Sequence, residues 1–442
     1  MLGAIAKRTE FLTVLGNREF RIYSIGLVAS VLGQQMLIAT QAWLVYFLTS
    51  SPATLGIVAG VHAIPGLVVT LIGGAVADRF DPRKIILLMQ GLSALIMAVL
   101  ATLVVTSQVE VWHIVVSAFL TGITQSFDSP ARRTVWPPMI RRDQFMFAIS
   151  ISQATWNGTR IIAPGLAGFI IAAVSRMADD DGPMGAGVSL YVTFLGFLIM
   201  AVAMTMIRLP PVTRSSGASV LHDIKDGFVF IARRKIYLYL LGISLASGYF
   251  GLSYMWLMPV FAAEYLGADS FGYGTLLSVG GAGAMTGVLA IASFGQYQDR
   301  PLILFGGSAM AGLFVIVFAV TSAVFESYPL ALVLMFFLGL SFAIVQVATG
   351  TTVNLLIPDE FRGRVLGFRG LMFNLSPLGS LQAGLIASAT NAPLAVSIGG
   401  GILIIIAVLI YVLSPEVRRL RTLVAEATAA HEARDAERKA TA

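Results

Sequence analysis

The sequence contains no cysteine and few charged residues. Of its 442 residues, 12% are Asp, Glu, Lys or Arg, against roughly 25% in a typical soluble domain, and 57% are hydrophobic. The absence of cysteine excludes disulfides, thiolate metal sites and cysteine nucleophiles. The scarcity of charge excludes an ordinary soluble domain, so we expect the chain to lie in a membrane.

Twelve apolar runs are long enough to cross the hydrocarbon core, which takes about 20 helical residues. We predict an all-α polytopic membrane protein with twelve transmembrane helices and no cleavable signal peptide. An even number of crossings returns both termini to the same face. The runs lie at about 20–47, 54–77, 84–106, 111–131, 145–174, 189–207, 236–263, 271–294, 301–323, 329–353, 365–388 and 393–413.

The basic residues gather on one face of this predicted membrane protein. Among the 29 lysines and arginines, the exceptions are Arg160, inside a run, and Arg176, in a loop on the opposite face. The positive-inside rule makes the basic face cytoplasmic. We therefore expect a multi-pass protein of the cytoplasmic (inner) membrane with both termini inside. The net charge of +6 reflects this orientation and gives little support to a nucleic-acid partner.

Two short segments recur about half the chain apart. An Asp-Arg pair ends the second run at Asp78 and the eighth at Asp299, and Pro138 and Pro358 each begin a similar charged loop. Weak internal symmetry of this kind is typical of secondary transporters, in which two bundles move about a central site. We predict a cytoplasmic segment at 1–19, six-helix bundles at 20–207 and 236–413, a partly amphipathic cytoplasmic linker at 208–235, and a charged cytoplasmic tail at 414–442 that contacts lipid headgroups.

The segment from Gly74 to Lys84, G-A-V-A-D-R-F-D-P-R-K, resembles the loop between helices two and three of the major facilitator superfamily. It differs from that loop at Asp81 and Pro82, where the family has glycine and arginine. The stretches 127–133, 157–168 and 358–365 look like the branch that contains the enterobactin exporter and macrolide efflux proteins, the transmembrane secretion effector family. This resemblance covers residues 16–413. It implies the major facilitator fold and a transporter working by alternating access, not an enzyme, with no cofactor.

The same resemblance implies a cytoplasmic gate built from breakable charge contacts. Asp78 would face the positive N-terminal end of the eleventh helix, and Arg79 or Arg83 would pair with Asp128. Asp128 also has an alternative partner in Arg132, one helical turn away. The alternative to gating is that these residues form permanent contacts between the cytoplasmic helix ends, or that the arginines only set the membrane topology. The gating candidates are Gly74, Asp78, Arg79, Arg83, Asp128, Arg362 and Arg364.

Arg160 is a basic residue deep inside a run, where an arginine costs about 2.5–3.5 kcal/mol on insertion scales. It therefore needs a partner or a watery cavity, and could hold an anionic or carbonyl-rich substrate. The alternative is structural hydrogen bonding within the bundle. Polar and aromatic residues in other runs suggest, as a set, the wall of a cavity. Any single one of them is more simply explained by packing or hydrogen bonding between helices. The substrate or coupling candidates are Arg160, Gln34, Gln35, Gln125, Gln153, Asn157, Tyr249, Tyr254, Trp256 and Gln346.

Pro164, Gly165 and Gly168 resemble the helix-five glycine motif of antiporters in the superfamily, although small residues also serve general helix packing. We expect export of a small organic molecule, such as a siderophore or hydrophobic drug. Proton antiport rests on the resemblance, because no carboxylate lies unambiguously mid-span. The alternatives are an importer or a lipid flippase of the same fold, and a membrane sensor or scaffold that does not transport. The expected partners are the substrate, protons and membrane lipids, and no metal site is expected.

Overall fold

The protein is described here from a computed structural model that covers residues 14–178, 183–208, 228–293, 301–358 and 361–429, without the side chains of 68–79, 362, 363, 371, 373 and 374. Within these residues every regular element is helical. The elements are α2 (Arg18–Thr49), α3 (Pro52–Arg79), α4 (Pro82–Val105), α5 (Val111–Val135), η1 (Pro137–Met139), η2 (Arg142–Gln144), α6 (Phe145–Ala178), α7 (Met184–Met206), α9 (Lys235–Ala246), η3 (Ser247–Gly251), α10 (Tyr254–Val260), η4 (Phe261–Tyr265), α11 (Ser270–Ser293), η5 (Leu302–Gly306), α12 (Gly307–Phe325), α13 (Tyr328–Leu356), α14 (Arg362–Asn374), α15 (Ser376–Ala389), α16 (Ala392–Leu413) and α17 (Pro415–Arg418).

The predicted all-α membrane fold is confirmed. Each predicted run coincides with a helix or a succession of helices, with ends that differ by a few residues. In the described part of the chain, nine helices are long and apolar enough to span a membrane, and the fully described part of α3, Pro52–Leu67, is also apolar. The total of twelve crossings therefore stays a prediction.

The outward faces of these helices carry large apolar side chains. On α4, Leu88, Leu95 and Val99 recur at intervals of seven and four residues, and each side chain is more than half exposed. Such a stripe would be costly in water, at about 25 cal/mol per Å² of apolar surface. It fits a helix face that contacts lipid.

The chain forms two compact units. Unit 1 contains Met1–Gly217 and Trp256–Gly281, and unit 2 contains Ala218–Met255 and Ala282–Ala442. The bundle boundaries expected from sequence symmetry, 20–207 and 236–413, stay predictions. Much of the predicted linker, at 209–227, lies outside the described residues.

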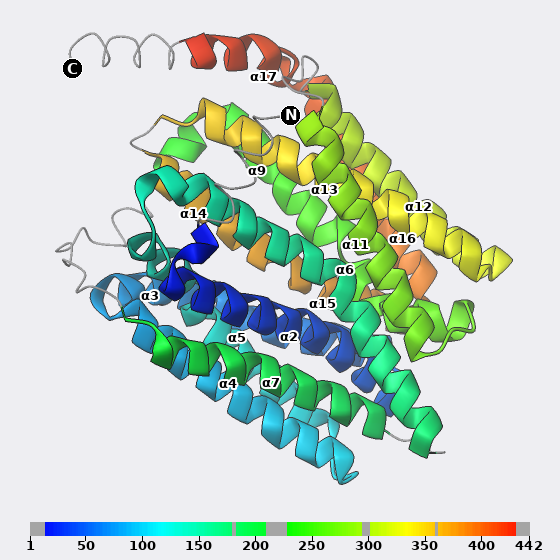
Figure 1. The fold of residues 1–442 in the computed structure, drawn as a ribbon. Coiled ribbons are helices and arrows are strands. Elements are labelled where there is room, and N and C mark those ends of the chain that lie inside the picture. Colours follow the sequence, from blue (N-terminus) through cyan, green and yellow to red (C-terminus); the bar gives the residue numbers. More distant parts are fainter. Residues whose placement is uncertain (1–13, 179–182, 209–227, 294–300, 359–360, 430–442) are drawn as a thin grey trace, which may run out of the picture. The chain divides into compact units, whose positions relative to one another are not determined.

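In unit 1, α7 packs against α2 and α4, while α5 packs against α3 and α4 (Figure 1). Small residues bring these helices close. A β-carbon at Gly196 would lie 2.5 Å from the carbonyl oxygen of Ala29, and one at Gly33 would lie 3.1 Å from that of Thr193. Lipid provides no hydrophobic force between helices, so close van der Waals packing at such positions holds them together.

Side chains define where two helices of unit 1 begin. Asn17 caps α2 by accepting hydrogen bonds from the amides of Glu19 and Phe20 at 3.0 and 3.3 Å. Asp81 caps α4 by accepting from the amide of Arg83 at 2.9 Å, and Pro82 occupies the first turn, where its missing N–H costs nothing. The departure of this loop from the superfamily pattern therefore still produces a sharp helix start.

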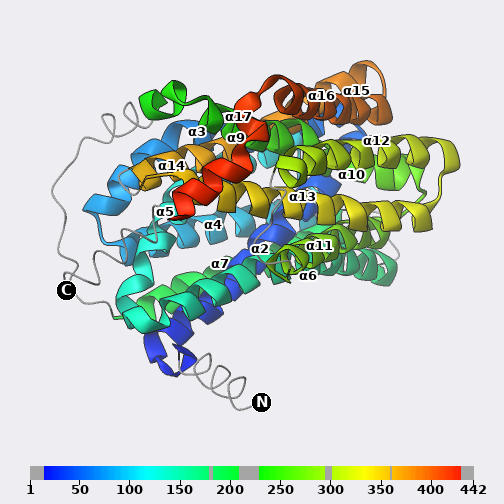
Figure 2. The same cartoon turned by 90° about the horizontal axis from the view of Figure 1, so that it is seen from above.

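In unit 2, α12 packs against α13 and α16 (Figure 2). Two of its predicted spans are interrupted. The first passes from α9 into the π-helical turn η3 and leaves helical geometry at Leu252 before α10 begins. The second breaks between α14 and α15, where Pro377 follows in the first turn of α15. Proline removes a backbone donor, which explains why α14 does not simply continue.

The predicted charged tail begins with a short amphipathic helix. Ser414 caps α17 by accepting from the amide of Val417 at 3.3 Å, and helical structure continues to residue 429. Val417, Leu420 and Val424 are buried at helical spacing, while Arg418 and Arg419 are exposed. The described part of the tail is thus attached to unit 2 through one apolar face.

Candidate functional site

A stripe of polar side chains on α2 faces α5. Tyr23, Ser30, Gln34 and Gln41 follow one another at intervals of seven, four and seven residues, which places them on one helix face. Each hydrogen-bonds to a residue of another helix, and we call this stripe with its partners the α2–α5 polar seam. Its partners are Ser117, Gln125, Asp128 and Arg132 of α5 and Gln90 of α4.

Two glutamine contacts form the middle of the seam. Gln34 donates from Nε2 to Oε1 of Gln125 at 3.0 Å, and Gln41 donates to the hydroxyl of Ser117 at 3.1 Å. Gln34 and Gln125 are half-buried, whereas Gln41 is fully buried. The structure therefore brings two of the substrate candidates, Gln34 and Gln125, into direct contact, while Gln41 serves helix packing.

Asp128 and Arg132 form a buried ion pair in the same seam. Arg132 also donates from Nη2 to the hydroxyl of Ser30 at 2.6 Å, and Ser30 donates to Gln90 at 2.8 Å. Asp128 and Arg132 are 6% and 8% exposed. In the described structure Oδ1 of Asp128 and Nη1 of Arg132 have no hydrogen-bond partner. The pair is thus buried but incompletely satisfied, which makes it easier to break than a saturated one.

Of the partners considered for Asp128, the described structure shows Arg132, while the side chain of Arg79 lies outside the described residues. Arg83 instead donates from Nε to the carbonyl oxygen of Met204 at 2.6 Å and from Nη2 to that of Thr205 at 3.0 Å. Both carbonyls lie in the last turn of α7, where a cation neutralises the negative helix end.

The remaining gating candidates lie at helix ends. Gly74, Asp78 and Arg79 belong to the last turns of α3, and Arg362 begins α14, but their side chains lie outside the described structure. The guanidinium of Arg364 lies 5.7 Å from the ring centroid of Phe361, a cation–π distance. Their gating roles stay predictions.

One face of α6 is polar and accessible. Gln153, Asn157 and Arg160 recur at intervals of four and three residues, with Gln153 exposed and the other two half-buried. Asn157 donates to the backbone carbonyl of Gln153 at 2.9 Å. Among the described residues Arg160 has no hydrogen-bonding or ion-pair partner. Gln35 of α2 is also half-buried.

The glycine motif of α6 makes close contact with the first part of α11, which belongs to unit 1 as far as Gly281. A β-carbon at Gly168 would collide with the carbonyl oxygen of Ser270 and lie 3.0 Å from Cα of Gly274, and one at Gly165 would lie 2.7 Å from the hydroxyl of Ser278. The packing interpretation of Pro164, Gly165 and Gly168 therefore has a defined partner.

Two polar contacts in unit 1 join the ends of α2 and α6 to residues after the seventh predicted span. The phenol of Tyr46 donates to Glu264 at 3.2 Å, and Arg176 pairs with Asp269 at 3.1 Å. All four residues lie at the acid-rich face. Sequence reasoning recognised the charges of this face but not the pairs, although Arg176 among acids was the available signal.

Tyr273 of α11 adds a buried contact beside these pairs. Its phenol donates to the carbonyl oxygen of Ala39 at 3.2 Å, and its ring stacks on Trp43 at a centroid distance of 5.3 Å. Because Tyr273 is almost fully buried, its hydrogen bond and ring stacking are shielded from water, unlike the two partly exposed pairs.

The aromatic candidates of the seventh span divide into two kinds. Tyr254 and Trp256 are 5% and 7% exposed and belong to the core. Tyr249 is half-buried and meets Phe250 edge-on at 4.9 Å. Of this set Tyr249 has the exposure that a binding role requires.

Gln346 of α13 is half-buried, and its backbone carbonyl accepts a hydrogen bond from Arg369 of α14 at 3.0 Å. Arg369 was counted from the sequence only as a topology-setting cation. Its position inside the predicted run 365–388 was the sequence signal, whereas its half-burial and its contact with Gly350 emerge only from the structure.

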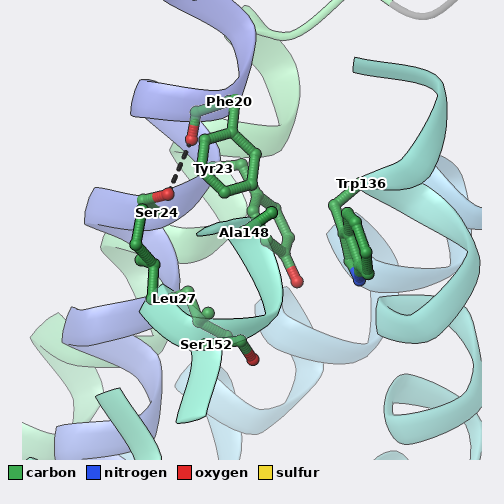
Figure 3. A pocket seen from close by; sticks show the side chains of 8 residues that line it. Phe20, Tyr23, Ser24, Leu27, Trp136, Ala148 and Ser152 are labelled. Carbon is green, nitrogen blue, oxygen red and sulfur yellow. Dashed lines mark hydrogen bonds between the residues drawn. The ribbon is translucent and has the colours of Figure 1, made fainter. Parts of the chain in front are cut away.

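A small pocket in unit 1 lies between α2, the end of α5 and α6, lined by Phe20, Tyr23, Ser24, Leu27, Trp136, Ala148, Ile151 and Ser152 (Figure 3). Its lining is mostly apolar, and the hydroxyl of Ser24 is already bonded to the carbonyl of Phe20 at 2.8 Å. It encloses essentially no space that a water molecule could occupy, whereas small-molecule sites have roughly 300–1,000 Å³. We therefore do not assign the substrate to it.

Known relatives are transporters. The chain is 27% identical over 371 residues to the multidrug efflux pump Tap of Mycolicibacterium fortuitum, covering 81% of this chain and 87% of the pump. It is 20% identical to macrolide efflux protein A of Streptococcus pyogenes, over 78% of this chain and 84% of that protein. It is 23% identical to the staphyloferrin A transporter of Staphylococcus aureus, over 85% and 91%.

A solved structure shows the same fold. A bacterial homologue of the human lysosomal transporter Spinster superposes with a TM-score of 0.69 at 13% sequence identity, covering 95% of this chain and 98% of that one. The family model described as transmembrane secretion effector matches residues 10–437, nearly the whole chain. The chain therefore belongs to the transmembrane secretion effector family, a group of major facilitator membrane transporters and not of enzymes.

Proposed function

We propose that the chain exports a small organic molecule, a siderophore or a hydrophobic drug, across the cytoplasmic (inner) membrane by alternating access and in exchange for protons. Both termini would lie in the cytoplasm. Membership of a transporter family carries this proposal, and the named activities of the relatives support efflux.

The polar side chains of unit 1 support a binding role. Gln34 and Gln125 of the seam, and Gln153, Asn157 and Arg160 on α6, keep part of their surface accessible within membrane-spanning helices. Amides there provide donors and acceptors that can orient a bulky, partly apolar solute. We assign the cargo contacts to this set together with Gln35, and to Tyr249 and Gln346 in unit 2.

Two groups of contacts suit a gate. At the basic end, the Asp128–Arg132 pair lacks partners for one oxygen and one nitrogen, so its rearrangement costs less than that of a saturated network. At the acid-rich end, Tyr46–Glu264 and Arg176–Asp269 are partly exposed, so water can replace them at low cost. Breakable contacts at both ends are what alternating access requires.

Proton coupling needs a group whose charge can change. Within the described spans, Asp128 is the buried carboxylate, and the groups that face it are Arg132, Ser30 and Gln90 through their shared network, with Tyr23 bonded to the Arg132 carbonyl. Breaking the Asp128–Arg132 pair would free α2 from α5, because Arg132 also holds Ser30. No coupling residue is assigned, and the pH-gradient experiment tests the antiport part of the proposal.

The test begins by comparing the small molecules retained by cells with and without the protein. A compound retained only without the protein is then offered to inverted membrane vesicles, with and without an imposed pH gradient. We expect accumulation that stops when the gradient is collapsed. Accumulation that ignores the gradient would remove antiport, and accumulation only in right-side-out vesicles would make the chain an importer.

Three variants test the residue roles in the same vesicles. Asp78→Asn and Arg160→Ala should each reduce the initial rate, the first by weakening the gate and the second by removing a cargo contact. Arg419→Gln, at an exposed cation of the tail, is the control and should leave the rate unchanged. Unchanged flux in either test variant would remove that assignment.

A further inference from the structure

The guanidinium of Arg369 in unit 2 rests on the backbone of α13 at Gly350. A β-carbon at Gly350 would lie 2.5 Å from Nη1, 2.9 Å from Nη2 and 3.0 Å from Cζ of Arg369. Any other residue at this position would displace the guanidinium. Glycine at position 350 therefore provides the space in which a cation lies half-buried inside a predicted span.

Most of the hydrogen-bonding capacity of this guanidinium is unused by the described residues. Arginine has five N–H donors, and Arg369 uses one of them on the backbone carbonyl of Gln346 at 3.0 Å. Within the part of the chain that the structure describes, no carboxylate pairs with it. It lies four residues inside the predicted span that begins at residue 365, about 6 Å along the helix axis. A half-buried cation within a span is stabilised when an anion or water meets it.

The polypeptide is interrupted nearby. The break between α14 and α15 packs against the π-helical turn η3, where a β-carbon at Gly248 would lie 3.6 Å from Cβ of Ser376. Ser247, the neighbouring residue in η3, is 2% exposed, and its hydroxyl has no hydrogen-bond partner in the described structure. Interrupted membrane helices are where secondary transporters bind solutes, and the N-terminal end of the second half-helix favours anionic groups.

Unit 1 has the same charge bias. Its Asp128 is neutralised by Arg132, while Arg160 has no acidic partner among the described residues. The described side chains within the predicted spans therefore carry more positive than negative charge. An interior of this kind binds anions more readily than cations, because desolvated charges are strongly coupled.

We propose that Arg369 recognises a carboxylate of the cargo, so that the exported molecule is an amphipathic organic acid. The planar fork of a guanidinium matches a carboxylate through two parallel hydrogen bonds. Gly350 is then a positioning residue that lets the fork lie flat on α13. This assignment rests on the proposed transport function and specifies its substrate class.

Binding by the purified full-length chain in lipid nanodiscs tests the assignment. The probes are two matched pairs, 1-naphthoate with 1-naphthamide and decanoate with decanamide, and the readout is the rise in the thermal unfolding temperature with probe concentration. We expect a carboxylate to stabilise the wild-type chain at lower concentration than its amide. If no carboxylate does so, the proposal is overturned.

Variants separate recognition from structural support. Arg369→Gln and Gly350→Ala should each raise the carboxylate concentration needed for half the shift by about tenfold or more, because a hydrogen bond to a charged group is lost. The response to the amide should not change. Arg369→Lys should recover part of the preference, and Arg419→Gln in the tail should retain all of it. A carboxylate preference that survives Arg369→Gln contradicts the proposal.

Two further measurements distinguish a cargo carboxylate from a lipid phosphate, and recognition from transport. If phosphatidylglycerol in the nanodisc stabilises the wild type but not Arg369→Gln, while neither carboxylate does, a lipid phosphate is the ligand and the cargo assignment is overturned. Vesicle uptake of the compound found by the cell comparison is measured separately. Gradient-driven uptake without any carboxylate preference removes this inference alone, whereas failure of uptake removes the transport proposal itself.

Discussion

The contact between α6 and α11 within unit 1 predicts how a single methyl group will change the conformational equilibrium. In Gly168→Ala the new β-carbon would collide with the carbonyl oxygen of Ser270 and approach Cα of Gly274 to 3.0 Å. These are backbone atoms, so relief requires the two helices to separate. Gly158→Ala, in the same helix, adds a methyl group that meets nothing within 4 Å.

The expected size of the effect follows from the packing. Overpacking a close contact costs about 1–3 kcal/mol. If one conformation keeps this contact and the other loses it, the equilibrium shifts by about 5- to 150-fold toward the separated one, since 1.4 kcal/mol is about a factor of ten. Both alanines also gain the same helix propensity in either conformation, so that term cancels in the comparison.

Because the sequence contains no cysteine, an introduced thiol can be labelled without background from native thiols. A single Ser278→Cys introduces the only thiol of the chain, at a hydroxyl that is buried in the α6–α11 contact. We expect a membrane-permeant maleimide to label this thiol at least about fivefold faster in Gly168→Ala than in the parent, and at the parental rate in Gly158→Ala. Equal labelling rates in the two glycine variants would refute the view that this contact opens during transport.

Three other changes have defined outcomes. Asp128→Asn should lower the free energy of unfolding by about 3–5 kcal/mol, because it leaves Arg132 charged and unpaired. The double change Asp128→Asn with Arg132→Gln should cost less. Thermal unfolding of the two variants measures the difference, and equal losses would contradict the reasoning. Asn17→Ala removes the cap of α2 and the hydrogen bond that Asn17 donates to the carbonyl oxygen of Met139 at 2.6 Å, so it should cost about 1–2 kcal/mol in the same measurement. Asn17→Asp keeps the cap but cannot donate to Met139, and full wild-type stability in that variant would contradict a role for the second bond. Tyr46→Phe and Glu264→Gln should each raise the Ser278→Cys labelling rate by less than about fivefold, because their bond is partly exposed; a larger rise would mean that this pair holds the contact by itself.

The helices could be predicted from the sequence because a membrane leaves few alternatives. Unpaired backbone groups are too costly in lipid, so each long apolar run must be helical. The ends of α4 and α16, for example, differ from the predicted limits by no more than two residues. The interruption at Leu252 could not be predicted in the same way, because apolar and aromatic residues surround it, whereas Pro377 was an available sequence signal for the interruption at Leu375.

The site could be predicted only as a set of residue types. Glutamines in a span indicate hydrogen bonds between helices, but the sequence does not name their partners. Gln34 bonds to Gln125 and Gln41 bonds to Ser117, because the rotation of each helix about its axis determines which side chains meet. Likewise Asp128 had candidate partners on its own helix, at the end of α3 and at the start of α4. The structure shows it paired with Arg132, which lies one turn away on the same helix.

One tyrosine hydrogen bond occurs in both units at corresponding places in the predicted order of spans. In unit 1 the phenol of Tyr23 donates to the backbone carbonyl of Arg132, near the end of α5, and in unit 2 that of Tyr237 donates to the carbonyl of Leu356, at the end of α13. In both, a tyrosine fastens the first predicted span of its half to the end of the fourth. Because a phenol can bond to any residue's carbonyl, this scaffold contact does not depend on which side chain stands at the partner position. The side chain at the partner position can therefore differ: Arg132 joins an ion pair in unit 1, whereas the residue in unit 2 is Leu356.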